Sequence, residues 1–184
     1  MSLLRIRCAL RDAPERCLWV LLDGTRAPMP GEGPLAQLPR HAERVQLVIP
    51  AADVLLTSAR LPPGGRRHAA ATLAYAIEED TAGDPESNAV NWLGQGDDGD
   101  ALAVLDRPGL KRWLDALDGI GIEAPEIHCE TLFLDRAAGE WSMAWNGREG
   151  FLRTGELQGS ATDCGERARP PLSLRLALEE ARSS

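Results

Sequence analysis

The side chains that most often perform catalysis or bind metals are scattered along this chain. Three histidines and four cysteines are present: His41, His68, His128, Cys8, Cys17, Cys129 and Cys164. Only His128 and Cys129 are adjacent, and neighbours in a strand point to opposite faces, so they are not expected to form a catalytic pair. A zinc site built on these two would lack a second close pair of ligands. The segment "EIHC" is therefore interpreted as part of a strand. Because no C-x-x-C pair exists, the cysteines are interpreted as reduced thiols of a cytoplasmic protein.

A phosphate cradle is the second chemistry that the sequence offers, at "LPPGG", residues 61–65. The glycines precede an expected helix, and Arg66 and Arg67 would attract an anion to the helix N-terminus. However, prolines have no N–H to donate, and no lysine or hydroxyl side chain follows at the spacing of a nucleotide-binding loop. The alternative is a rigid turn that leads from a strand into the helix. The sequence contains none of the motifs G-x-x-x-x-G-K-[ST], G-x-G-x-x-G, G-x-S-x-G and H-E-x-x-H.

The run "DDGD", residues 97–100, is the third candidate, for calcium. It lacks the ligand spacing and the terminal glutamate of an EF-hand loop, so a solvated acidic loop is the simpler interpretation. The sequence therefore predicts no catalytic residue, metal ligand or cofactor.

Composition and charge limit the classes of function. The chain has 184 residues, 43% of them hydrophobic, which is enough for one large domain or two small lobes. Its 28 acidic residues outnumber the 20 basic ones, and the net charge of −8 repels nucleic-acid backbones. The N-terminus lacks a signal-peptide pattern, and no apolar stretch reaches the roughly 18 residues of a membrane span. A globular protein without nucleic-acid contacts is therefore expected.

Alternation and turn residues predict strands in the first part of the chain. Strands are expected at 3–10 and 17–24, paired antiparallel, with Asp23-Gly24 as a hairpin turn. Residues 26–42 contain four prolines and two glycines and are expected to be mostly loop, with one helical turn near 35–38. Two strands and a helix complete this part, at residues 44–50, 53–61 and 65–81.

The second part adds strand–helix–strand units and a hairpin. Strands 88–94 and 100–106 are joined by the acidic loop, and a helix is expected at 107–121 with Pro108 in its first turn. The apolar side of this helix consists of Leu110, Trp113, Leu114 and Leu117. A strand, a hairpin with a type I′ turn at Asn146-Gly147, and a terminal helix follow at 125–129, 140–155 and from about Ser173. The order indicates a mixed α/β fold.

The helix expected at 65–81 carries an aromatic side chain opposite its small apolar face. At 100° per residue, Ala69, Leu73, Ala76 and Ile77 share the face expected to pack on the sheet, while Tyr75 points to the polar side. An amphipathic aromatic in that position is a candidate partner contact, unless a loop near Trp92 folds over it. The preferred contact candidates are Tyr75, Glu78, Glu79 and Asp80, followed by Arg66 and Arg67. A rival surface lies on the 140–155 hairpin, with Trp145, Arg148 and Arg153.

Residues 54–93 resemble the cytoplasmic domain of type II secretion system protein L. The matching positions read Leu55-Leu56-Thr57 and Leu61-Pro62-Pro63-Gly64, followed by Leu73-Ala74-Tyr75-Ala76-Ile77-Glu78-Glu79. Ala74 replaces the proline that is usual in the family, so a straighter helix is expected. The resemblance extends over about residues 3–160 in the order of elements.

The resemblance implies a degenerate actin-like (RNase H-like) α/β fold, with a mixed sheet flanked by helices in two or more subdomains. We assign 1–84 to the first subdomain and 85–184 to the second, with a tail that leads towards a membrane span absent from this chain. The family implies a non-catalytic domain at the cytoplasmic face of the bacterial inner membrane. It would bind the N-terminal domain of the secretion ATPase and anchor it to the other inner-membrane platform proteins. Whether it forms a homodimer is left open, and the alternative is an actin-like ATP-binding enzyme, a phosphotransferase or ATPase.

Overall fold

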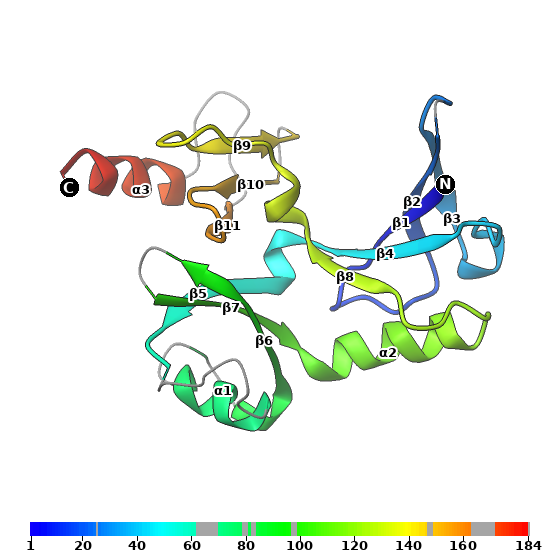
Figure 1. Cartoon of the computed structure of the whole chain (residues 1–184), viewed down its shortest axis with the longest axis horizontal. Helices are drawn as coiled ribbons and strands as arrows, with labels where there is room; N and C mark the ends of the chain where they lie inside the picture. The colour runs from blue at the N-terminus through cyan, green and yellow to red at the C-terminus, as the bar shows by residue number, and fades with distance from the viewer. Residues whose placement is uncertain are drawn as a thin grey trace.

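Three β-sheets organise the chain in the computed structural model (Figure 1). The structure describes residues 1–24, 26–61, 70–78, 81, 84–96, 99–146, 149–162 and 172–183. In these ranges one sheet has five strands and two have three. The turn expected at 61–65 and part of the "DDGD" loop therefore lie outside the described residues.

The five-stranded sheet has the order β3-β2-β1-β4-β8. Its strands are β1 Ser2–Arg7, β2 Cys17–Asp23, β3 Met29–Gly33, β4 Arg44–Ile49 and β8 Glu126–Cys129. β1 pairs in parallel with β4 and β4 with β8, whereas β2 runs antiparallel to both β1 and β3. This order, with one reversed strand, is that of RNase H-like sheets, so the fold class expected from the sequence is confirmed.

Helix α2, Arg107–Asp118, forms because the sequence supplies both a start signal and an apolar face. Asp106 caps the helix, and its Oδ2 accepts a hydrogen bond from the backbone N–H of Gly109 at 2.7 Å. Pro108 lies in the first turn, where a missing N–H costs nothing. The predicted helix is confirmed, although it ends at Asp118 and Gly119 is its C-cap.

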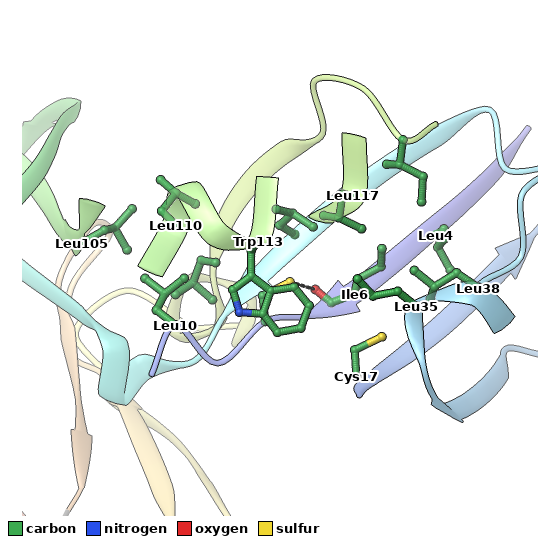
Figure 2. Close-up of a cluster of buried hydrophobic side chains, with 14 of the residues drawn as sticks. Leu4, Ile6, Leu10, Cys17, Leu35, Leu38, Leu105, Leu110, Trp113 and Leu117 are labelled. Carbon is green, nitrogen blue, oxygen red and sulfur yellow. Dashed lines mark hydrogen bonds between the residues drawn. The ribbon is translucent and has the colours of Figure 1, made fainter. Parts of the chain in front are cut away.

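The apolar face of α2 packs into the main hydrophobic core (Figure 2). Leu110, Trp113 and Leu117 are buried there against the inner side chains of β1, which include Leu4 and Ile6. Figure 2 shows the indole of Trp113 pointing from the helix into this cluster. Because the core lies between α2 and one face of the five-stranded sheet, the opposite face of that sheet is left for other contacts.

The second sheet has the order β5-β7-β6 and carries helix α1. Its strands are β5 Val54–Ala59, β6 Asn88–Gly96 and β7 Gly99–Asp106, all antiparallel, and the described part of α1 spans Ala70–Ala76. Short 3-10 helices border these elements: η2 Ala51–Asp53, η5 Pro85–Ser87 and η6 Glu130–Phe133. The predicted strands and their hairpin are confirmed, but the helix expected to reach Thr81 ends at Ala76.

The third sheet is an antiparallel meander in the order β11-β10-β9, followed along the chain by helix α3. Its elements are β9 Ser142–Trp145, β10 Gly150–Arg153, β11 Gly159–Thr162 and α3 Leu172–Ser183. The predicted 140–155 hairpin and the terminal helix are confirmed, but β11 was not predicted. The turn type expected at Asn146-Gly147 falls partly outside the described residues.

The region 26–42 is less irregular than its proline content indicated. Residues Met29–Gly33 form β3, an edge strand, so the expectation of a mostly looped segment was wrong there. The turn expected at Asp23-Gly24 closes β2 and leads to β3, which pairs antiparallel with it. Pro30 is tolerated because an edge strand can leave one N–H position unpaired. The single helical turn was placed correctly and is η1, Leu35–Gln37.

The division at residues 84 and 85 does not follow the sheets. β5 lies before this boundary but pairs with β7, which lies after it. In the same way β8 follows the boundary but completes the sheet that β1 and β4 begin. The physical units are therefore the three sheets, and the unit of β5, β6 and β7 is inserted between β4 and β8.

Glu126 on β8 gives the first testable prediction. Hydrogen bonds from Gln46, Arg44 and His128 lower its pKa to about 2, from a usual value of 4.5. The ionised form is thus favoured in the folded state, so its stabilisation is complete above pH 4.5 and is lost as the pH falls through about 2. A titration of the Glu126 carboxyl carbon by NMR should show a midpoint near 2. A midpoint close to 4.5 in the wild type would contradict the predicted contacts. An Arg44→Gln variant in which the pKa of Glu126 does not rise would contradict them as well.

Candidate functional site

The polar side of α1 is the surface on which the sequence placed its preferred contacts. Leu73 and Ile77 are buried against β6 and β7, as the helical angle predicted, but Ala76 is exposed and Ala74 is buried in its place. Tyr75 is 58% exposed, and Glu78 after the helix is also exposed. Trp92 packs in the core beneath the helix, and its Nε1 donates to Asp100 at 2.8 Å. Tyr75 is therefore not covered by the loop that the alternative interpretation required.

Several predicted contacts fall outside the described ranges. These residues are Arg66, Arg67, Glu79, Asp80 and Arg148. Tyr75 and Glu78 are thus the two preferred candidates that the structure places, and both are exposed, Tyr75 on α1 and Glu78 just after it.

The rival surface on the β9–β10 hairpin divides into two roles. Trp145 is half-buried and lines a groove together with residues of β10 and β11. Arg153 instead binds the chain itself, because its guanidinium donates to the carbonyls of Leu132 and Leu134, at 3.1 and 2.7 Å. It also donates to the carbonyl of Glu156 at 2.7 Å. These bonds join β10 to η6, to the residue that follows it and to the loop after β10, so most of the donors of Arg153 are already used.

The residues considered as metal ligands or nucleophiles are involved in contacts within the fold. Cys129 is buried while His128 is partly exposed, with its Nε2 3.3 Å from the carboxylate of Glu126. No group of three or more potential ligands comes together in the part of the chain that the structure describes. Asp100 from the acidic loop accepts the hydrogen bond from Trp92. Burial raises the pKa of Cys17 to about 11, so this thiol is not nucleophilic at neutral pH.

Sequence reasoning missed a pair of carboxylates that cap backbone amides at one end of the five-stranded sheet. Asp53 accepts from the N–H of Leu10 at 2.8 Å and pairs with Arg11 at 3.0 Å. Glu130 accepts from the N–H of Ala51 at 3.3 Å and from Arg7, whose Nε lies 3.0 Å away. Amides and arginines are the groups that bind phosphate. Here the chain's own carboxylates occupy them.

Comparison with known proteins identifies the family of this chain. The model of the family described as type II secretion system (T2SS), protein L matches residues 24–168. The chain belongs to the type II secretion system protein L family. The resemblance read from residues 54–93 is therefore confirmed.

Two curated members of the protein L family illustrate the extent of the match. The protein L of Vibrio cholerae serotype O1 is 29% identical over 119 residues, which are 65% of this chain and 29% of that protein. The protein L of Dickeya chrysanthemi is 24% identical over 146 residues, 76% of this chain and 36% of that protein. The chain thus spans about a third of the length of these relatives.

A solved structure supports the fold of this protein L chain. It is the cytoplasmic domain of EpsL, an inner membrane component of the type II secretion system of Vibrio cholerae. The TM-score is 0.74 with 22% sequence identity, over 89% of this chain and 71% of that chain. Among the helices of the described ranges, none combines the length and the apolar character that a bilayer crossing requires.

Proposed function

We propose that this chain is a non-catalytic docking domain that binds the N-terminal domain of the secretion ATPase. Membership of the protein L family is the observation that carries the proposal. In this role the domain works at the cytoplasmic face of the bacterial inner membrane and holds the ATPase to the other platform proteins. Tyr75 of α1 and Glu78, which follows the helix, are both exposed and supply an aromatic and an acidic contact.

The alternative of an ATP-binding enzyme has less support. Nucleotide phosphates need backbone amides and cations that are free to bind them. The N–H groups of Leu10 and Ala51 are used by Asp53 and Glu130, and Arg7 is paired with Glu130. An added phosphate would have to displace a carboxylate that is already part of the fold, and would meet its negative charge.

Calorimetric titration of the ATPase N-terminal domain with this chain tests the proposal. Binding is expected in the micromolar range, and it should weaken at high salt because the chain carries a net charge of −8. The same titration gives the molar ratio of the two chains, and sedimentation of this chain alone tests for a homodimer. Absence of binding at low salt would overturn the proposed function.

Tyr75→Ala tests the helix surface within that experiment. The substitution should weaken ATPase binding about tenfold, because a partly exposed aromatic contributes to affinity only when a partner covers it. The free energy of unfolding should not change, since Tyr75 is 58% exposed. Tyr75→Phe is the matched control, which keeps the ring and should bind nearly as wild type. A loss of stability without a loss of affinity would assign Tyr75 to the fold.

A further inference from the structure

A groove lies between the five-stranded sheet and the third sheet. Its volume is about 640 Å³, within the range of sites that take small ligands or short peptide segments. Leu18 of β2 lines one side, and Ala144, Trp145 and Phe151 of the hairpin line the other. In Figure 1 the third sheet lies apart from the five-stranded sheet, on the side where β4 ends.

The walls of this groove are apolar and partly open. β2 is apolar on both faces, with Cys17 and Leu21 buried in the main core and Leu18 on the other face, 47% exposed. A strand with apolar residues on both faces is typical of sheets covered on both sides. Phe151 is half-buried opposite, and the small Ala144 leaves space beside it. The hairpin therefore covers the outer face of β2 only in part, and apolar surface at Leu18 remains accessible.

The charges of the groove favour a cation. Its ionisable lining residues in the described ranges are Arg7, Glu130 and Glu149. Arg7 and Glu130 form an ion pair at 3.0 Å and neutralise each other. Glu149 is exposed, and its negative charge acts on Arg7 together with that of Glu130, so the lining has two carboxylates for one guanidinium and keeps a net negative charge. The backbone N–H of Glu149 donates to Asn146 at 2.8 Å, which fixes the residue at the mouth of the groove.

We propose that this groove binds a short segment of a partner protein in which large apolar residues flank a lysine or arginine. The apolar side chains would cover Leu18 and Phe151, and the cation would pair with Glu149. An anionic segment is disfavoured because Glu149 would repel it and the nearby N–H of Ala51 is already taken by Glu130. This proposal goes beyond ATPase docking and does not depend on it.

Two synthetic pentapeptides, acetylated and amidated, test the proposal with the whole chain. One has the sequence Ala-Leu-Lys-Leu-Ala and the other Ala-Leu-Glu-Leu-Ala, and binding is followed by the NMR signal of the Trp145 indole N–H. The lysine peptide should bind about fivefold more tightly, the difference expected for one attractive against one repulsive surface ion pair. Glu149→Lys should reverse the preference.

The control variant is Glu86→Lys, which makes the same charge change on exposed η5, away from the groove. It should keep the wild-type preference for the lysine peptide. Three results would overturn the proposal: equal affinities of the wild type for the two peptides, the same peptide preference in Glu149→Lys and Glu86→Lys, or no saturation with either peptide. Because Glu149 and Glu86 are both exposed, their variants should keep the wild-type backbone spectrum, which the same NMR samples verify.

Discussion

Replacing Trp113 by alanine is expected to lower the free energy of unfolding by about 4 kcal/mol. The indole is 1% exposed at the centre of the contact between α2 and the five-stranded sheet. Its Nε1 donates to the carbonyl of Ala9 at 2.9 Å, so the substitution both opens a cavity and removes the partner of that carbonyl. Denaturant unfolding followed by circular dichroism measures the change.

Trp113→Phe separates the two contributions. Phenylalanine keeps most of the apolar volume but loses the hydrogen bond to Ala9, so a smaller loss of about 1–2 kcal/mol is expected. If both variants unfold at the wild-type denaturant concentration, α2 does not anchor the sheet in solution and the description of the core is wrong.

Replacing Glu130 by alanine is expected to cost about 2 kcal/mol. Burial lowers the pKa of Arg7, but the hydrogen bonds and charge of Glu130 more than offset this and raise it above its ordinary value. Without Glu130 the guanidinium stays partly desolvated and unpaired, and the N–H of Ala51 loses its acceptor. A buried ion pair that loses one partner costs about 3–5 kcal/mol, and we reduce this because Arg7 is 39% exposed.

Glu130→Gln is the matched variant for this prediction. The amide oxygen in the place of Oε2 can still accept from the N–H of Ala51 and from Nη2 of Arg7, whereas the bond from Nε to Oε1 is lost, so the loss should be about half of that in Glu130→Ala. Equal losses would show that the charge, and not the hydrogen bonds, determines the effect. If neither variant lowers the free energy of unfolding, the carboxylate of Glu130 does not stabilise the fold through these bonds.

Local signals in the sequence were sufficient to predict the elements that are determined by residues close together in the chain. Helix α2 was predicted because Pro108 marks its start and Leu110, Trp113 and Leu117 recur at helical spacing. The exposure of Tyr75 followed from the same angular argument on α1. In both cases the face that packs is set by residues within a few turns of each other.

Elements that depend on distant side chains were missed. β3 was read as loop because of Pro30 and Gly31, but Gly31 is needed where the indole of Trp19 lies on the strand and a Cβ would collide with it. β11 contains Gly159, where a Cβ would collide with the carbonyl of Leu152 and with Thr131. Such glycines appear as turn signals in the sequence because the residue that requires them belongs to another element that packs against the strand.

The carboxylate caps could not be found from sequence for a similar reason. Asp53 and the amide that it caps are 43 positions apart, and Glu130 lies 123 positions from Arg7. No short motif records these pairs. The sequence did indicate the absence of a nucleotide-binding motif, but the physical arrangement that accompanies it emerges only when η2 and η6 are placed beside the end of β1.

The insertion of the β5, β6 and β7 unit between β4 and β8 fixes an order of events during synthesis. β4 pairs with β8 across 80 positions, from Gln46 to Glu126, and α2 also comes from the later part of the chain. A ribosome that has released only the first hundred residues has delivered neither the edge strand nor the helix that covers the core. The apolar residues of β1 and β4 therefore stay exposed until the inserted unit and α2 have been synthesised. During this interval the nascent chain is most prone to aggregate.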